Sequence, residues 1–430
     1  MQLLDHAPLV ASVLSPQTWP FDLKLLPQSA HLVGGSVRDA LLGRQADYLD
    51  LDFVLSDHAI ETARAIAHHH NAGFVVLDAK HQIARVVFEQ ATLDFAQQVG
   101  DSLETDLHRR DFTVNAIAYH PHTEVLLDPL GGYADLQRQQ LRMISVKNLR
   151  QDPLRLLRAY RQAAQLHFTV EAKTQATIKQ LAGLLSQVAA ERVRGELDAL
   201  LSTAAGTPQL SVCWRDGLLQ NWLPDITLDG LHRLAAMDQV YAQLKTTRPA
   251  LALPLRGWLK EQTIPGMHRS WIKAAKLSQL LTVDLDQAEA TLTHLKYSRA
   301  EQQSVLAILR GMALIRQGTR LENGALTIRD RYRLFQSVGS SFLGLALLAL
   351  ANGTEPQLIE PLIQHYLNPD DPVAYPKALV SGRDLMKALD LRPGPSIGEL
   401  LAAIQLAHAE GKLDTASEAL IWAKHWLADE

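Results

Sequence analysis

The sequence predicts an α/β amino-terminal part, with a mixed sheet and flanking helices, followed by an all-helical remainder. Up to about Ser145, short segments rich in β-branched and aromatic residues alternate with helix-like segments. After about Lys147, apolar residues recur at helical spacing almost to the end. A chain of 430 residues is too long for one compact core, so about two to four domains are expected.

Five segments of the first part are expected to be strands, because each is short and rich in β-branched or aromatic residues. They are AHLVGG (30–35), LDFVL (51–55), FVVLD (74–78), IARVVF (83–88) and TLDFA (92–96). The segment from Ser56 to Gly73 is expected to be a helix, since it begins at a Ser cap and ends at a Gly.

Helical periodicity is clearest in QDPLRLLRAYRQAAQL (151–166), TQATIKQLAGLLSQV (174–188) and ERVRGELDALLS (191–202). Asp152 followed by Pro153 predicts a helix start, because Pro is tolerated at the first helical position. The longest apolar run, residues 342–351, is too short to cross a bilayer, so no membrane segment is expected.

The composition indicates a cytoplasmic protein. A single cysteine, Cys213, excludes an intramolecular disulfide and favours a reducing compartment. The first residues lack the basic stretch of a signal peptide, so none is expected.

A net charge of −4 is not that of a strongly basic nucleic-acid binder, although a local basic patch can still bind RNA. The best candidate patch carries Lys245, Arg248, Arg256, Lys260, Arg269, Lys273 and Lys276 against one acid, Glu261, with Trp258 and Trp271 between them. Lys273 and Lys276 are therefore expected on an RNA-binding surface. The alternative is an ordinary solvated helical face with the Trp side chains in the core.

The segment 31–54, HLVGGSVRDALLGRQADYLDLDFV, holds the residues best suited to chemistry. Alternate residues of a strand face the same way, so Asp50 and Asp52 should project together while Leu51 and Phe53 point into a core. Two carboxylates on one face repel each other unless a cation lies between them. Such a pair suits two-metal phosphoryl transfer.

Residues on either side of this pair suit phosphate binding. Gly34 and Gly35 have no Cβ atoms and let backbone N–H groups approach a phosphate closely. Arg38 is expected to face the phosphate and Asp39 to be structural. Downstream, Asp94 on the TLDFA strand is expected to add a third carboxylate.

The segment LETDLHRRDFTVNAIAY (103–119) adds two adjacent arginines. Arg109 and Arg110 suit a triphosphate, because guanidinium groups donate several hydrogen bonds to phosphate oxygens. The neighbouring Asp111 can accept a hydrogen bond from a ribose hydroxyl. Asn115 follows four residues later.

From residue 31 to about residue 200, the chain resembles the class II tRNA nucleotidyltransferase family, the CCA-adding enzymes and their bacterial poly(A) polymerase relatives. GGSVRD with Asp50 and Asp52 resembles the family's catalytic motif, and RRDFTVNA its ribose-selecting motif. Asp128, Gly132 and Arg142 match the spacing of its hinge motif. QDPLR resembles the nucleotide-templating motif, and ERVRGEL the last neck motif.

The resemblance implies an elongated enzyme with a catalytic head (1–145), a nucleotide-selecting neck (146–205), and a body (206–370) and tail (371–430) that bind tRNA. It implies two Mg²⁺ ions on Asp50 and Asp52, with Asp94 as a further catalytic carboxylate. The donor would be CTP, with or without ATP, and the acceptor the 3′ end of a tRNA. The nucleotide-binding residues implied are Gly34, Gly35, Arg38, Arg109, Arg110, Asp111, Asn115, Asp152, Arg155 and Arg158.

Asp152 and Arg155 have a physical logic as selectors of the base. They are three residues apart and are expected to share a helix face. A carboxylate accepts and a guanidinium donates, so the pair can imitate the edge of a complementary base. CTP and ATP both present an amino donor beside a ring-nitrogen acceptor, unlike UTP and GTP, and a lost buried hydrogen bond costs about 1–3 kcal/mol.

Two departures from the family pattern bear on specificity. Gln151 stands where the family usually has a Glu that steadies the templating Arg, which implies a looser Arg155. The link between Asp94 and Arg109 is short, whereas many CCA-adding members carry a longer loop tied to the switch from C to A addition. The resemblance therefore favours CC addition, with a separate enzyme adding the A, and leaves addition of all three nucleotides open.

Two other functions remain as alternatives. A poly(A) polymerase often has a basic carboxyl-terminal extension, whereas this sequence finishes in ALIWAKHWLADE. A catalytically silent RNA-binding relative has no need to keep metal-binding carboxylates, so Asp50 and Asp52 argue against it.

Overall fold

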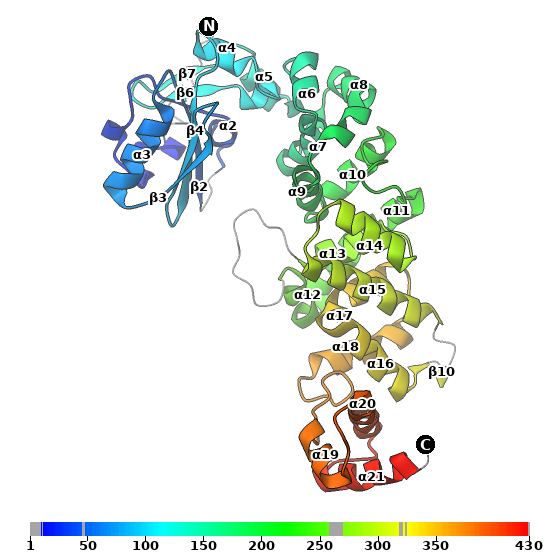
Figure 1. Ribbon diagram of the computed structural model, residues 1–430. Coiled ribbons are helices and arrows are strands. Elements are labelled where there is room, and N and C mark those ends of the chain that lie inside the picture. Colours follow the sequence, from blue (N-terminus) through cyan, green and yellow to red (C-terminus); the bar gives the residue numbers. More distant parts are fainter. Residues whose placement is uncertain are drawn as a thin grey trace. The chain divides into compact units, whose positions relative to one another are not determined.

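The computed structural model describes residues 10, 12–44, 48–257, 270–317, 321–322 and 325–428 (Figure 1). The chain forms two compact units, Met1–Ala189 with Arg215–Leu218, and Ala190–Trp214 with Leu219–Glu430. The first unit contains the α/β part, and the second is helical apart from a short hairpin. The finer division at residues 145, 205 and 370 remains a prediction.

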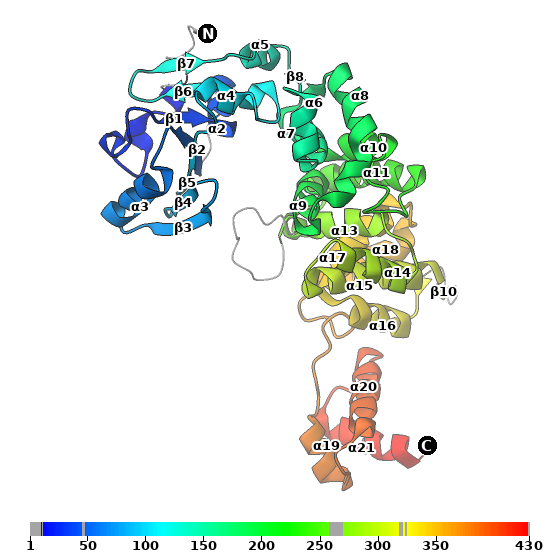
Figure 2. The ribbon, with the colours of Figure 1, turned by 45° about the horizontal axis from the view of Figure 1, so that its top comes forward.

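A seven-stranded mixed sheet is the centre of the first unit and confirms the predicted fold class. Its strands run in the order β3 (Gly73–Asp78), β4 (Ile83–Val87), β5 (Ala91–Gln97), β2 (Leu49–Leu55), β1 (His31–Val33), β6 (Ala118–His120) and β7 (Val125–Leu127). β2 and β5 are parallel, and the other neighbours are antiparallel. The helix α3 (Ala59–His70) packs on β3, β4 and β5, as Figure 2 shows.

The ends of α3 differ from the expected Ser56 cap and Gly73 stop. The helix begins after His58, whose φ is 54°, and ends before Asn71, whose φ is 53°. Asn tolerates this left-handed conformation because its short side chain can bond locally, so it ends the helix early. Gly73 instead opens β3.

The first unit also contains helices before, between and after the strands of this sheet. In chain order they are η1 (Pro16–Thr18), η2 (Leu23–Leu25), α2 (Gly35–Leu41), α4 (Leu103–Leu107), η3 (Thr113–Asn115), α5 (Gly132–Gln137), α6 (Val146–Gln151), α7 (Leu154–Leu166), α8 (Ala172–Leu181) and η4 (Ala182–Gln187). β8 (Gln140–Leu141) pairs in parallel with β9 (Thr169–Val170) between them.

One continuous helix from Gln151 through Arg155 was expected, and this expectation is wrong. α6 ends at Gln151, Asp152 is extended with φ −134° and ψ 91°, and α7 begins at Leu154. Pro153 causes the break, because its ring disfavours a helical conformation of the preceding residue. Pro153 therefore stands just before α7 rather than as its first residue.

The second unit is an array of helices around a buried apolar core. They are α9 (Ala190–Leu201), α10 (Gly206–Arg215), α11 (Leu228–Thr247), α12 (Pro249–Leu255), α13 (Trp271–Gln279), α14 (Leu285–His294), α15 (Arg299–Gln317), α16 (Ile328–Val338), η5 (Gly339–Ser341), α17 (Phe342–Ala351), α18 (Pro356–Leu367), α19 (Gly382–Leu389), α20 (Pro395–Ala409) and α21 (Ala416–Ala428). β10 (Leu321–Glu322) and β11 (Ala325–Leu326) form the hairpin. α13, α15 and α17 pack on one another, and α19–α21 enclose a separate core around Leu385, Leu400 and Ile404.

The stretch Ile328–Ala351 has the length and composition of a membrane span, and its most apolar window has a mean hydropathy of 1.7. It is interrupted after α16, where Gly339 has a φ of 49°. Within its most apolar window, 67% is buried inside the second unit. Burial of this kind is typical of core helices in a water-soluble fold.

Lys273 and Lys276 are on α13, and their expected place on an RNA-binding surface is wrong. The exposed fraction is 2% for Lys273 and 0% for Lys276. The Nζ atom of Lys273 lies 3.0 Å from Asp198 and 2.9 Å from Glu301, and that of Lys276 lies 2.7 Å from Asp238. Both ammonium groups are neutralised inside the helical unit, so neither can contact a phosphate backbone.

The rest of the expected basic patch is only partly described. Trp258, Lys260, Glu261 and Arg269 lie outside the described residues. Trp271 is buried, as the alternative interpretation expected. Arg248 pairs with Glu360 at 2.7 Å, which ties the end of α11 to α18.

We expect Lys276→Met to lower the free energy of unfolding by about 3 kcal/mol, because it leaves Asp238 without its buried partner. The matched control is Lys377→Met, which removes one side of the exposed pair with Asp370 and should cost less than about 1 kcal/mol. Urea unfolding followed by tryptophan fluorescence compares the two variants. Equal small shifts would contradict a buried structural role for Lys276.

Candidate active site

Three carboxylates lie on one face of the sheet. In the β2–β5 register, Asp52 is opposite Asp94 and Asp50 is opposite Thr92. Leu51 and Phe53 are each 1% exposed and point to the other face, where Phe53 stacks on a Phe of β5. The alternation expected along this strand is therefore confirmed, and parallel pairing brings Asp94 beside Asp52.

Ionisation of Asp50 and Asp52 is disfavoured at this position. Burial, and next the charge of Asp50, raise the pKa of Asp52 to about 6, while Arg110 opposes the shift. Burial and the charge of Asp94 raise the pKa of Asp50. Because the raised pKa values mark unfavourable negative charge, a cation bound between Asp50 and Asp52 would stabilise their ionised forms.

Arg85 neutralises one member of the group and was missed by the sequence analysis. It lies opposite Asp94 in the antiparallel β4–β5 register. Its Nε and Nη2 atoms donate to the two oxygens of Asp94, both at 2.7 Å. Only knowledge of which strands pair could have identified it.

The donor set fits a hard divalent cation. Carboxylate oxygens are the ligands that Mg²⁺ prefers, and Mg²⁺ usually takes one or two of them and completes its shell with water and substrate phosphates. Both oxygens of Asp94 are engaged by Arg85, which leaves Asp50 and Asp52 for a metal. Within the described residues, no group of three or more His, Cys, Asp or Glu side chains is arranged for one ion.

A glycine turn brings the backbone next to these carboxylates. Gly34 connects β1 to α2 with a φ of 80°, a conformation that L side chains rarely adopt. A Cβ atom there would lie 3.1 Å from Oδ2 of Asp52 and 3.4 Å from Nη1 of Arg110. The absence of a side chain at Gly34 therefore permits the close approach of the turn, Asp52 and Arg110.

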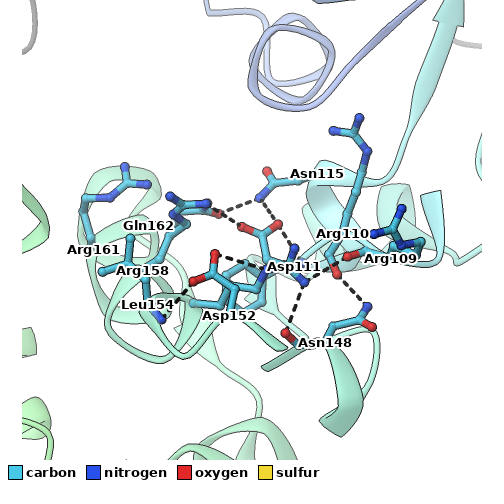
Figure 3. A network of polar contacts seen from close by, with 12 residues as sticks. Arg109, Arg110, Asp111, Asn115, Asn148, Asp152, Leu154, Arg158, Arg161 and Gln162 are labelled. Atoms are coloured by element: carbon cyan, nitrogen blue, oxygen red, sulfur yellow. Dashed lines mark hydrogen bonds and ion pairs between the residues drawn. The ribbon is translucent and has the colours of Figure 1, made fainter. Parts of the chain in front are cut away.

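A network of hydrogen bonds extends from α2 to α7. Arg38 donates from Nε and Nη2 to Asp39, and from Nη1 to Oδ1 of Asn115 at 2.8 Å. The Nδ2 atom of Asn115 donates to Asp111 at 3.0 Å and to Oε1 of Gln162 at 2.9 Å (Figure 3). Gln162, which the sequence analysis missed, is 5% exposed and links the sheet part to α7.

α7 also carries a cationic face beside Gln162. Arg155, Arg158 and Arg161 recur every three residues, and Arg158 lies 3.8 Å from Asp111 (Figure 3). Arg161 was also missed, although the spacing Arg-x-x-Arg-x-x-Arg was a signal for it. The three guanidinium groups place positive charge across from the carboxylates.

A cavity of about 410 Å³ lies between the acidic and cationic sides. Its lining contains most of the predicted site: Gly34, Gly35, Arg38, Asp50, Asp52, Arg110, Asp111, Asn115, Arg155 and Arg158. Arg161 and Gln162, which were not predicted, complete it. A second cavity of about 680 Å³ reaches the same Gly35, Arg38, Asp50 and Asp52. Both cavities lie within the first unit.

Three other predicted residues lie beside the first cavity rather than in its lining. Asp94 is held by Arg85, as described above. The side chain of Arg109 is exposed, but its carbonyl oxygen accepts from Nη1 of Arg155 at 2.9 Å. Asp152 is in the break before α7, where Oδ2 lies 4.0 Å from Nε of Arg155 and Oδ1 accepts from the amide of Leu154.

The residues of the predicted hinge motif, Asp128, Gly132 and Arg142, support the site without lining the first cavity. Asp128 accepts from the amides of Gly132 and Tyr133 at 2.7 and 2.9 Å. Arg142 donates to Asp135, which also accepts from Thr113. A Cβ atom on Gly132 would lie 2.2 Å from the carbonyl oxygen of Thr113, so α5 packs directly under the turn that carries Asn115.

Acidic oxygens and guanidinium groups thus face each other across one cavity. Carboxylates in such a site can hold divalent cations, and the arginines can bind the phosphates of a nucleotide. The mixed sheet and this division of charge define an enzyme of the nucleotidyl-transferring class.

Comparison with known proteins agrees with this class. The model described as the Poly A polymerase head domain matches residues 30–142. The model for the RNA and SrmB-binding site of polymerase A matches residues 167–229, and that for tRNA nucleotidyltransferase domain 2 matches residues 268–423.

Curated relatives match nearly the whole chain. It is 46% identical over 410 residues to a CC-adding tRNA nucleotidyltransferase of Synechocystis sp., covering 95% of this chain and 96% of the relative. It is 34% identical to an A-adding tRNA nucleotidyltransferase of Deinococcus radiodurans, covering 94% and 96%. It is 30% identical to a CCA-adding enzyme of Streptococcus pneumoniae, covering 91% and 92%.

Solved structures share the fold. A CCA-adding enzyme in complex with CTP matches with a TM-score of 0.74 at 21% identity, over 99% of this chain and all (100%) of the other. The Thermotoga maritima CCA-adding enzyme with tRNA matches with a TM-score of 0.70 at 20% identity, over 99% and 100%. The chain belongs to the tRNA nucleotidyltransferase family.

We expect Gly34→Ala to remove most nucleotide incorporation, because the new methyl group crowds Asp52 and Arg110. Gly43→Ala is the matched control: Gly43 also has a positive φ, of 66°, but a Cβ atom there meets nothing within 4 Å. Each change should cost about 1–3 kcal/mol of stability through backbone strain. If incorporation falls equally in both variants at equal folded fractions, the crowding argument is wrong.

Proposed function

We propose that this enzyme adds two C residues to the 3′ end of tRNA, using CTP and releasing pyrophosphate, and that a separate enzyme adds the terminal A. The observation that carries the proposal is the compact link between β5 and α4, residues 98–102. In many CCA-adding members of the family, a longer loop at this place is tied to the switch from C to A addition. The identity to the CC-adding relative of Synechocystis sp. supports the same specificity.

The link is short and closed by its own hydrogen bonds. The amide of Val99 donates to Asp106, and the side chain of Gln98 donates to the carbonyl oxygen of Gly100. Ser102 caps α4 by accepting from the amide of Thr105. A segment held in this way has little length with which to rearrange around a second kind of nucleotide.

Addition of all three nucleotides is the second candidate, because relatives that are 34% and 30% identical are named as A-adding and CCA-adding. Poly(A) synthesis is the third, since the head-domain model takes its name from poly(A) polymerase. These activities differ in products and can be separated by one assay.

In the proposed reaction, the 3′-hydroxyl oxygen of the tRNA forms a bond to the α-phosphorus of CTP as the bond to pyrophosphate breaks. The hydroxyl proton is released, and the RNA grows by one CMP. Asp50 and Asp52 would hold two Mg²⁺ ions, and bound there the metals would supply activation of the attacking oxygen and neutralisation of the leaving group. The protein otherwise contributes mainly by positioning the reactants.

The cavity residues fit distinct parts of the nucleotide. Arg38, Arg110 and Arg158 suit the triphosphate, since guanidinium groups bind phosphate oxygens in pairs of hydrogen bonds. Asp111 and Asn115 lie between them and suit the ribose hydroxyls. The second cavity, which shares Asp50 and Asp52, supports entry of the RNA 3′ end from the other side of the carboxylates.

Base selection is assigned to Asp152 and Arg155. Both side chains are half-buried, which favours discrimination because unmatched hydrogen-bonding groups are costly away from water. Asp152 would accept from the amino group of the base, and Arg155 would donate to the acceptor edge.

We place the enzyme in the cytoplasm, with the body and tail binding tRNA away from its acceptor end.

The test is extension of a tRNA that lacks its CCA end, with CTP alone, ATP alone and both nucleotides together. The proposal predicts products that stop after two C residues even when ATP is present. A third nucleotide with ATP would establish CCA addition, and long A tails with ATP alone would establish a poly(A) polymerase.

In the same assay, Asp50→Ala and Asp52→Ala should each reduce incorporation by more than about a thousandfold, because each removes a metal-binding carboxylate. The affinity for tRNA, measured by a mobility shift, should stay within about twofold, since neither residue is expected to grip the tRNA body. Incorporation that survives both changes would remove these residues from the active site.

Arg155→Ala should lower the preference for CTP over UTP by about tenfold or more, because one partner of the base edge is lost. The quantity to compare is kcat/KM for each nucleotide. The affinity for tRNA should change much less. A variant that prefers CTP as strictly as the unaltered enzyme would exclude Arg155 from base selection.

A further inference from the structure

The group that orients Arg155 is not at position 151. Gln151 is exposed, and its side chain makes no hydrogen bond or ion pair within the part of the chain that the structure describes. Asp152 is only loosely paired with Arg155, since the nearest atoms are 4.0 Å apart. The guanidinium group must therefore be held by something else.

Two backbone carbonyl groups hold it. The Nη1 atom of Arg155 donates to the carbonyl oxygen of Arg109 at 2.9 Å and to that of Asn148 at 3.2 Å. Burial lowers the pKa of Arg155, so these acceptors meet a partly desolvated cation. The Nη2 atom makes no hydrogen bond with the described residues, which leaves it available to a ligand.

The side chain of Asn148 fixes the first of these acceptors. Its Nδ2 atom donates to the carbonyl oxygen of His108 at 2.7 Å. It also donates to the carbonyl oxygen of Arg110 at 2.8 Å (Figure 3). These two carbonyl groups flank Arg109, so the peptide that presents the Arg109 oxygen is fixed on both sides. Asn148 is 4% exposed, and water cannot easily replace its donors.

Asn148 thus acts on Arg155 in two ways. Its side chain sets the Arg109 carbonyl, and its own carbonyl is the second acceptor. We propose that Asn148 is a positioning residue for nucleotide selection, which orients Arg155 by anchoring the 108–110 backbone to α6. The inference rests on the proposed role of Arg155 in selecting the base.

The expected consequence concerns specificity more than folding. Without the two donors of Asn148, the carbonyl groups of His108 and Arg110 lose their partners and the 108–110 backbone is free to shift. Arg155 then samples several orientations, and its preference for the cytosine edge weakens. A merely structural residue would lower stability and overall rate without changing the ratio between nucleotides.

The test measures kcat/KM for CTP and UTP, together with the thermal unfolding midpoint, in the full chain. Asn148→Ala should lower the CTP:UTP ratio by about tenfold, comparable to the loss of one buried hydrogen-bond partner. Asn148→Ser, which keeps one donor, should give a smaller loss and remains usable if the Ala variant does not fold.

Two matched controls separate positioning from stability. Ser145→Ala removes the cap of α6, whose oxygen accepts from the amide of Asn148, and leaves both side-chain donors in place. It should lower the unfolding midpoint but leave the CTP:UTP ratio within about twofold, because a lost cap acts on helix stability. Gln151→Ala should change neither quantity, since the exposed side chain of Gln151 makes no hydrogen bond or ion pair with a described residue.

The possible outcomes are distinct. A ratio that is unchanged in both Asn148 variants while Arg155→Ala relaxes it overturns the role of Asn148 alone. A ratio that no variant changes, Arg155→Ala included, overturns the proposed base selection itself. A loss of discrimination in Gln151→Ala, or an equal loss in Ser145→Ala, would also contradict the proposal.

Discussion

Asp50 and Asp52 project from the same face of β2, where burial and neighbouring carboxylates disfavour their ionisation. Burial and the charge of Asp94 raise the pKa of Asp50, and burial and the charge of Asp50 raise the pKa of Asp52 to about 6. Several neighbouring features follow from this crowding of negative charge. Arg85 neutralises Asp94, the third carboxylate, and Arg110 approaches Asp52 from the turn side. What remains is a pair of anions without a full set of counter-charges, which is the condition that favours a bound divalent cation.

Hydrogen bonds from buried amide side chains orient the cationic side of the site. Asn115 connects Arg38 to Gln162 and thereby joins the glycine turn to α7. Asn148 makes a corresponding connection near Arg155, because its side chain binds the 108–110 backbone to α6. Buried amides suit such positions because one side chain both donates and accepts, and each unpaired partner would be costly. The arginines that face the nucleotide cavity are therefore oriented before a ligand binds.

The sequence predicted the parts of this site that local pattern determines. Strand alternation placed Asp50 and Asp52 together, and motif order placed Arg110, Asn115 and Arg158 in one site; the structure brings all of them to one cavity. It could not predict Arg85 or Asn148, because their partners come from strand pairing and helix docking. Two predictions were wrong. Helical spacing continued one helix through Asp152, where Pro153 breaks it. The local excess of basic residues placed Lys273 and Lys276 on an RNA-binding surface, although acids far away in sequence neutralise both in the core.

We expect the carboxylates of β2 and the arginines of α7 to bind one nucleotide between them. Diffraction from crystals of the full chain grown with CTP and Mn²⁺ tests it most directly, because the anomalous signal locates the metal and the density locates the base. Manganese is expected at Asp50 and Asp52, with the cytosine edge facing Asp152 and Arg155. Manganese away from these carboxylates, or a base that does not reach α7, would contradict it.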